Sequence, residues 1–211
     1  MDASHNPFSG WAQVGSESSF LRDNNAIASS TFGALPYVNS PPPPASDLVT
    51  FYITSYDPDI LSSKVIGPNQ HRYLHIVTDP NNPRYTVFQN AHGKSVALVE
   101  WQSRPLVEIR DVMSKIPARD WLRLTPDGRK SYLRLVNRAR TMRIQGARYM
   151  WTPQGTYINM YSTDPAPVFL ARLSRGHGTI MLDLTNQAIQ LGLLDVCLIA
   201  GVVMQCGKNI D

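Results

Sequence analysis

An almost uninterrupted apolar stretch near the C-terminus limits what this 211-residue chain can fold into. Residues 188–204 read AIQLGLLDVCLIAGVVM and carry one charged side chain, that of Asp195. Thr185 suits a helix N-cap and Gly207 suits a helix end, so the pattern predicts a helix over about 186–205. A helix that is apolar on every side has to be surrounded by lipid or by protein.

The stretch makes a poor membrane span. A span needs about 20 apolar residues, whereas residues 191–204 are shorter and include Asp195. A carboxylate in the middle of a bilayer costs several kcal/mol, and the basic residues expected beside a span reduce here to Lys208. We therefore expect a helix buried in protein, with insertion into a membrane as the alternative.

The residues before this helix predict a protein made mainly of β-strands. From Asp47 onward, short runs rich in Tyr, Val, Ile, Thr and Phe alternate with turn residues, as expected for successive antiparallel strands. About ten such strands followed by one apolar helix favour an antiparallel sandwich or barrel with the helix inside. The predicted strands cover 49–56, 71–80, 84–90, 95–101, 105–111, 131–138, 141–145, 147–151, 156–162, 168–173 and 179–184.

Residues 1–46 have a different composition. They are rich in Ser, Asn, Ala and Pro, show no sustained period, and end in SPPPPAS. Such a segment cannot bury enough apolar surface to offset its ordering entropy, so we predict a disordered tail before one folded domain over 47–211. Recognition of the PPPP run by a proline-binding partner is the functional alternative to a linker.

Three features bear on the cellular compartment. The start of the chain lacks the basic and apolar regions of a secretory signal. Cys197 and Cys206 lie nine residues apart in or beside the predicted helix, where they face different directions and cannot easily form a disulfide. No Asn-x-Ser/Thr acceptor occurs. We expect an intracellular protein, cytoplasmic or peripheral to a membrane.

Three segments carry a resemblance to a known superfamily. They are RIQGARYMW (143–151), YINMYSTDPAPVFLARL (157–173) and LDLTNQAIQLGLLDVCLIAGVVM (182–204). In this order they resemble the Tubby C-terminal superfamily, which includes the phospholipid scramblases and the LURP-one-related proteins, and in particular an uncharacterised family of Tubby-like proteins from mushroom-forming fungi. The resemblance covers roughly residues 48–206 and implies a closed antiparallel β-barrel of about 10 to 12 strands around the C-terminal helix.

The positive charge of the chain, +4 in total, is concentrated in one stretch. Residues 119–148 hold nine Lys or Arg residues and two Asp residues, while residues 1–47 are net acidic. If the leucines of RKSYLRLVNR face the core, the alternate residues face outward. Arg140 is expected in the turn that follows, and Arg143 on the outer face of the next strand. The predicted basic outer face comprises Lys130, Arg134, Arg138, Arg140, Arg143 and Arg148.

A basic face of this kind attracts phosphate groups. Tubby domains bind phosphoinositides through basic surface residues, so the resemblance implies anionic phospholipid headgroups as the ligand class. We predict a non-enzymatic binding module of this kind or a protein-interaction adaptor; a solvated face without a ligand is the alternative for the basic stretch. A membrane-inserted, scramblase-like protein is the second hypothesis and an unrecognised enzyme the third. Nucleic acid is disfavoured, because Tyr132 is the only ring among the outward residues of RKSYLRLVNR.

Patterns for catalysis or metal binding are weak. The sequence has no G-x-S-x-G, no H-E-x-x-H and no phosphate-binding glycine loop. His71 and His75 would lie about 13 Å apart along one strand face, too far to share one metal ion. His177, in RGHG, has no partner that spacing identifies. We predict no catalytic residue, no metal and no cofactor.

Three further residues are expected to be structural. Strand alternation puts Tyr149 and Trp151 on one face, where both rings can pack against the central helix, with Arg148 and Met150 on the other. Asp195 is expected to accept hydrogen bonds from groups of the barrel, because a buried carboxylate needs partners.

Overall fold

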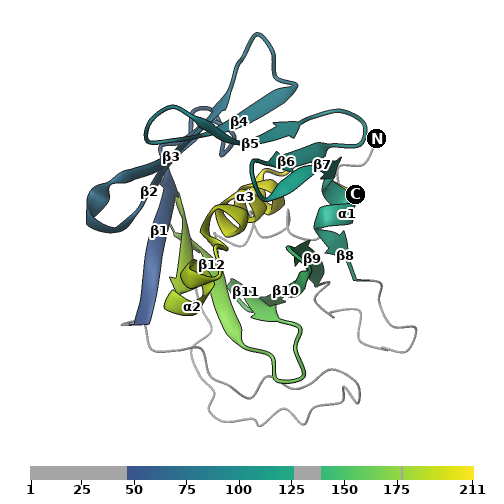
Figure 1. Cartoon of the computed structure of the whole chain (residues 1–211). Coiled ribbons are helices and arrows are strands. Elements are labelled where there is room, and N and C mark those ends of the chain that lie inside the picture. The colour runs from purple at the N-terminus through teal and green to yellow at the C-terminus, as the bar shows by residue number, and fades with distance from the viewer. Residues whose placement is uncertain (1–46, 126–138, 177) are drawn as a thin grey trace, which may run out of the picture.

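The computed structural model describes residues 47–125, 139–176 and 178–211; the predicted tail and the strand predicted over 131–138 lie outside them. The described chain is mainly β, with one large antiparallel sheet and few helices (Figure 1). The helices are η3 (Pro68–Gln70), α1 (Ala118–Trp121), α2 (Asn186–Gln190) and α3 (Leu194–Gln205). The strands are β1 (Leu48–Thr54), β2 (Ser63–Ile66), β3 (Arg72–Thr78), β4 (Tyr85–Asn90), β5 (Ser95–Glu100), β6 (Leu106–Ile109), β7 (Met113–Pro117), β8 (Arg123–Leu124), β9 (Arg140–Ile144), β10 (Ala147–Gln154), β11 (Tyr157–Ser162), β12 (Phe169–Gly176) and β13 (Thr179–Thr185).

The sheet has 13 strands in the order β7-β6-β5-β4-β3-β2-β1-β13-β12-β11-β10-β9-β8. Neighbours in the sheet are also neighbours in the chain, except where β1 pairs with β13. This pair runs antiparallel from Leu48 opposite Thr185 to Ile53 opposite Ile180. It joins the hairpins that follow β1 to those that precede β13, and the resulting sheet curls around α3 (Figure 1).

The closed barrel that we expected is not what the structure has, because the sheet is open between β7 and β8. Within the described residues, each of these edge strands pairs on one side only. β7 ends at Pro117, which has no N–H to donate, and the chain turns at once into α1. β8 is only 2 residues long. α1 packs beside both edge strands and buries Trp121, so a helical turn stands where a closed barrel would continue its hydrogen bonds.

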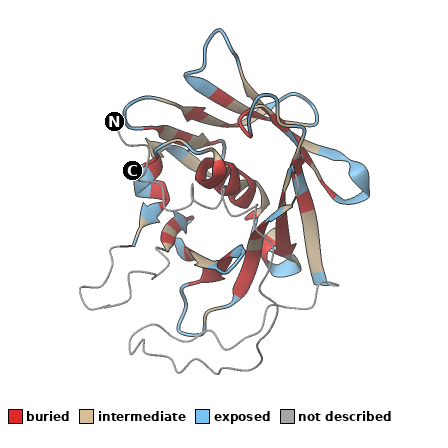
Figure 2. Cartoon of the chain, turned by 180° about the vertical axis from the view of Figure 1, so that it is seen from behind, coloured by how far each residue is buried: buried red, intermediate tan, exposed pale blue. Residues whose placement is uncertain are grey.

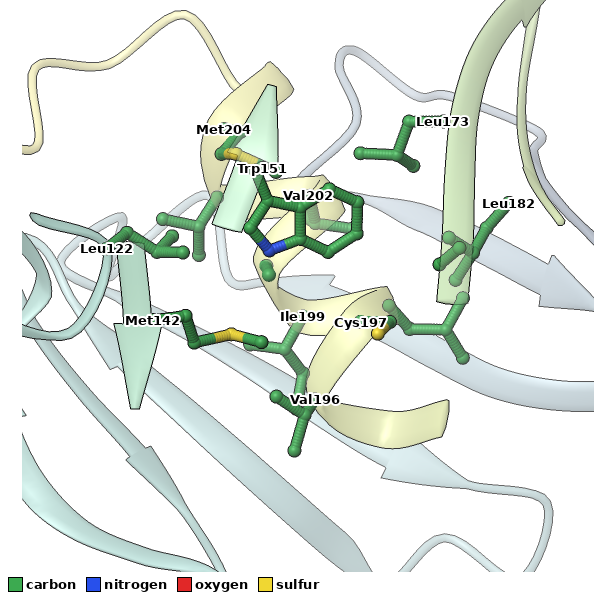
Figure 3. Close-up of a cluster of buried hydrophobic side chains, with 14 of the residues drawn as sticks. Leu122, Met142, Trp151, Leu173, Leu182, Val196, Cys197, Ile199, Val202 and Met204 are labelled. Carbon is green, nitrogen blue, oxygen red and sulfur yellow. The ribbon is translucent and has the colours of Figure 1, made fainter. Parts of the chain in front are cut away.

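α3 lies inside the curl of the sheet and is buried along its length, as Figure 2 shows. All of its residues from Val196 to Gln205 are buried, which satisfies the requirement that an all-round apolar helix be covered. The inner faces of the strands contribute most of the other core residues. Figure 3 shows Trp151, Leu173 and Leu182 around the helix. A Cβ on Gly201 would lie 3.0 Å from Leu173 Cδ2, so glycine allows α3 to approach β12 closely.

The helix predicted over 186–205 is two helices. Thr185 caps the first, since its Oγ1 accepts a hydrogen bond from the Ala188 N–H at 3.1 Å. α2 ends at Gln190, and Gly192 follows with a φ of +70°, a conformation that glycine adopts without strain. Gly207, at a φ of +74°, follows the end of α3. The break separates α2, in which Ala188 is the one buried residue, from α3, which is buried along most of its length.

Candidate functional site

Two exposed arginines lie directly opposite each other on the hairpin of β9 and β10. Arg143 pairs in register with Arg148, and both side chains are exposed. The turn between the strands is Gln145-Gly146, with φ values of 49° and 83°, as in the two-residue turns that match the twist of a hairpin. Directly opposed residues have Cβ atoms about 4.5–5.5 Å apart, so the two guanidinium groups share one patch of surface.

Arg123 adds a third cation to this patch. It lies on β8 opposite Thr141, which is two residues from Arg143 on β9, and its side chain is exposed. We call Arg123, Arg143 and Arg148 the basic hairpin face. None of the three makes an ion pair with a described carboxylate. Like charges directly across a strand pair destabilise it, so this arrangement favours an anion between the arginines.

Sequence reasoning placed Arg123 in the basic stretch but did not select it for the face. The sequence did not predict β8, because a strand of two residues shows no alternation from which the outward side chain could be assigned. Three residues of the predicted face, Lys130, Arg134 and Arg138, lie outside the described residues.

Arg140 does not belong to the basic face, contrary to our expectation. It begins β9 instead of lying in a turn, and its side chain is 0% exposed. Nη1 and Nη2 donate to the Asp211 carboxylate at 3.0 and 2.8 Å, and Nη1 also donates to the Leu122 carbonyl at 2.7 Å. The side chain points inward because Arg140 and Arg143 are an odd number of residues apart on one strand. The bidentate pair ties the residues after α3 to β9.

The two aromatic residues of β10 lie on its inner face. Tyr149 and Trp151 are buried, while Arg148 is exposed and Met150 half-buried on the outer face. Trp151 lies beside Val202 and Met204 of α3 (Figure 3). Burial raises the pKa of the Tyr149 phenol. These rings therefore form part of the core against the central helix.

Asp195 lies in the first turn of α3 and has a defined partner. Tyr73 Oη donates to Asp195 Oδ1 at 2.9 Å. A register shift between β2 and β3 at Val65 and Ile66 lies next to Tyr73 and interrupts the alternation of side chains. Burial, and then the nearby Asp195 carboxylate, raise the pKa of Tyr73 well above its ordinary value. The carboxylate also lies at the helix end that favours negative charge.

Neither cysteine has the character of a nucleophile. Both are free thiols, Cys197 buried and Cys206 partly buried. Burial raises the pKa of Cys197 well above its usual range and that of Cys206 to about 11. A thiol with a raised pKa is protonated near neutral pH and reacts slowly.

The described histidines do not assemble a catalytic or metal site. Among the described residues, no three His, Cys, Asp or Glu side chains lie together as metal ligands would. His75 lines a shallow hollow of about 340 Å³ with Ser55, Asp57, Ser62 and Lys64. No hydrogen bond joins His75 to the serines or to Asp57 there, so the hollow holds no charge-relay arrangement. His177 lies outside the described residues.

The described helices are too short or too polar to cross a bilayer. Residues 58–208 match a family described as a family of unknown function, DUF6593. The chain belongs to the DUF6593 family. In this DUF6593 protein the matched residues contain β2 to β13 together with α2 and α3, whereas β1 lies before them.

No curated protein matches the chain. A solved structure of a protein from Arabidopsis thaliana is similar over 72% of this chain and 90% of the other, at 9% sequence identity and a TM-score of 0.40.

Proposed function

We propose that this DUF6593 protein is a non-enzymatic, Tubby-like binding module that holds anionic phospholipid headgroups, phosphoinositides in particular, on its basic hairpin face. The observation that carries the proposal is the opposition of Arg143 and Arg148, exposed and without ion pairs to described carboxylates. A phosphate between two guanidinium groups replaces their repulsion with charge-assisted hydrogen bonds, which are the stronger kind.

The geometry suits a headgroup at a surface better than a buried ligand. The three arginines lie on β8, β9 and β10 at one edge of the sheet, and their side chains are exposed to solvent, as contact with a flat, charged membrane requires. A basic residue near an anionic leaflet contributes about 1 kcal/mol. Three such residues give weak, salt-sensitive association, as expected for a peripheral protein with an intracellular location. The resemblance of residues 48–206 to Tubby domains supports the same ligand class.

The non-enzymatic part of the proposal has separate support. The pKa values of Cys197 and Cys206 are both raised by burial, so the two thiols are protonated near neutral pH and are poor nucleophiles. A protein partner with an acidic surface would use the same arginines. This adaptor function is the second candidate, because the face has no feature that selects phosphate over carboxylate.

A membrane-inserted protein of the scramblase kind would have to withdraw α3 from the core. This helix has 12 residues and is about 18 Å long, compared with the roughly 30 Å of a hydrocarbon core. Extraction with alkaline carbonate separates the two functions. A peripheral module is released into the supernatant, and retention in the membrane pellet would favour insertion.

Vesicle flotation tests the proposed function. We expect the protein to float with phosphatidylcholine vesicles that contain phosphatidylinositol bisphosphate, at low salt, and to stay unbound with phosphatidylcholine alone. The double variant Arg143→Glu/Arg148→Glu should bind at least about 30-fold more weakly, since two favourable charges are lost. Arg84→Glu/Arg104→Glu, which reverses two exposed arginines on other loops, is the matched control.

The outcomes separate the candidates. Binding that is lost in the hairpin variant and kept in the control supports the headgroup site. Wild-type protein that does not float at low salt with any anionic vesicle would rule out the lipid function. Equal losses in both double variants would show that total charge, and not the hairpin face, governs binding.

A further inference from the structure

A row of polar side chains crosses the outer face of five neighbouring strands. The register places Thr50 opposite Asp183, Asp183 opposite Arg172, Arg172 opposite Asn159, and Asn159 opposite Thr152. Directly opposed residues project from the same face of a sheet. The row therefore runs over β1, β13, β12, β11 and β10, on the side away from α3. We call these five residues the polar row.

The charges within the polar row cancel. Arg172 Nε and Nη2 donate to Asp183 Oδ2 at 3.0 and 2.8 Å, and Thr50 Oγ1 donates to Asp183 Oδ1 at 2.7 Å. The two ionised side chains are thus paired with each other, and the other three members are neutral. A surface of this composition does not attract ions, in contrast to the basic hairpin face.

Two exposed tyrosine rings lie in the row next to the polar row. The adjacent row on the same face runs Tyr52, Met181, Ser174 and Tyr157 in register. Tyr52 is 43% exposed and Tyr157 42% exposed, unusually high for large rings. The Arg172 guanidinium lies 4.9 Å from the centre of the Tyr157 ring and holds that ring in place. Three strand spacings of about 4.8 Å put the two tyrosine positions roughly 14 Å apart.

Two buried polar atoms of the row lack hydrogen-bond partners. Asn159 is 5% exposed, and its Oδ1 accepts no hydrogen bond; Thr152 Oγ1 is also buried and unpaired. Such groups are rare because each one left unsatisfied is costly. The amide nitrogen of Asn159 donates to Oε1 of Gln154, an exposed residue whose Oε1 also accepts a hydrogen bond from Tyr161 Oη. The two unpaired atoms lie on opposed residues and could share one ligand hydroxyl.

We infer that this face binds a neutral oligosaccharide, with Tyr52 and Tyr157 as stacking platforms and the polar row as the source of hydrogen bonds. A sugar ring offers apolar C–H faces to aromatic rings and hydroxyls that both donate and accept. Sugar hydroxyls can donate to Asn159 Oδ1, which has no donor of its own. They can also form hydrogen bonds with the Thr152 hydroxyl and with the pair of Arg172 and Asp183. The absence of net charge favours a neutral sugar over an anionic one.

A peptide fits this face less well. Peptides that recognise sheets usually add a strand to an edge, through main-chain hydrogen bonds. Each of the five strands here lies inside the sheet, with a paired neighbour on both sides. Their main-chain groups are therefore occupied, and a ligand has to be recognised by side chains alone.

Affinity electrophoresis tests the inference on the full chain. The protein, with its net charge of +4, runs toward the cathode in native gels cast with or without a neutral soluble polysaccharide. The probes are a β-1,3-glucan, xyloglucan, mannan and glycogen, together with sedimentation on insoluble chitin. We expect at least one of them to retard or sediment the wild type, and Tyr157→Ala and Tyr52→Ala to weaken that binding by at least about tenfold.

Matched variants keep the result interpretable. Tyr85→Ala removes a ring that is 37% exposed on β4, away from both rows, and should bind as the wild type does. Thr152→Val keeps the shape of the residue and removes the unpaired hydroxyl. It should weaken binding while leaving the melting temperature unchanged or higher, because an unsatisfied buried group is lost.

Each outcome decides the inference. Loss of binding in the Tyr52, Tyr157 and Thr152 variants but not in Tyr85→Ala supports it. Wild-type protein that is neither retarded nor sedimented by any of the five probes overturns it, as does an equal loss in Tyr85→Ala. Vesicle flotation of Tyr157→Ala should match that of the wild type, so the failure of one site remains distinct from the failure of the other.

Discussion

Arg140 and Arg143 lie three residues apart on β9, yet one is buried and the other faces solvent. Arg140 forms a bidentate pair with Asp211 inside the protein, whereas Arg143 lies unpaired beside Arg148. The residue type and the charge density of the stretch are the same for both. Alternation along the strand turns Arg140 inward, where the Asp211 carboxylate pairs with it and gives it a structural role. The same alternation turns Arg143 outward, where it is available for a ligand.

Alanine substitutions of these two arginines should differ most in their effect on the free energy of unfolding. Arg140→Ala should lower the free energy of unfolding by about 3 kcal/mol, because it leaves Asp211 and the Leu122 carbonyl without their donor and opens a cavity. Arg143→Ala should change it by less than about 0.5 kcal/mol. Urea unfolding followed by circular dichroism measures both values. Equal losses would mean that Arg143 also stabilises the fold.

The hydrogen bond between Tyr73 and Asp195 is a second interaction between distant parts of the chain, and its loss should cost less stability than the loss of the Arg140 pair. Tyr73→Phe removes one hydrogen bond and should cost about 1 kcal/mol at neutral pH. Tyr85→Phe, at an exposed ring, should cost nothing measurable. A cost in the control as large as that in Tyr73→Phe would contradict a specific contribution from this pair.

The same pair predicts how stability depends on alkaline pH. The pKa of Tyr73 is raised in the folded protein, so the unfolded chain loses the phenol proton first as the pH rises above about 10. The folded state then keeps a proton that the unfolded state has released. The free energy of unfolding therefore falls as the pH rises in this range. Tyr73→Phe should lose less stability between pH 9 and 11 than the wild type, measured by urea unfolding at each pH.

The smallest expected change in stability is that of an Arg148 variant. The test is whether the variant is more stable or less stable than the wild type. Arg148→Glu places a carboxylate directly opposite Arg143 and replaces a repulsion with an attraction. We expect a gain of about 0.5 kcal/mol in stability, seen as a melting temperature about 1 to 2 °C higher. The same variant should bind anionic vesicles more weakly. A variant that is both less stable and a weaker binder would indicate a damaged fold rather than a lost ligand contact.

Long strands and the apolar helix were predictable because their side chains repeat with a clear period. The predicted ranges 84–90 and 156–162 match β4 and β11 to within a residue at each end. β2, β7 and β8 were missed. β8 has only 2 residues, and the sequences of β2 (SKVI) and β7 (MSKIP) do not alternate between apolar and polar residues. The break before α3 was missed as well, because a single glycine inside an apolar run does not by itself end a helix.

The candidate sites were predictable only in part. The outward direction of Arg143 and Arg148 follows from alternation within one hairpin, which is local information. The partner of Arg140 lies 71 residues away, and that of Asp195 lies 122 residues away. The polar row depends on the register of five strands that come from both ends of the domain, and register is a tertiary property.

From its residues alone, the chain was predicted to form many antiparallel strands and one helix that must be buried. Both conclusions rest on periods of 2 and 3.6 residues and on the cost of exposing apolar surface. Three features emerged only in three dimensions: the open edges of the sheet at β7 and β8, the pair between Arg140 and Asp211, and the set of outer side chains that share a row. These depend on contacts between distant residues, which local patterns cannot specify because strand pairing is set by the whole packed core.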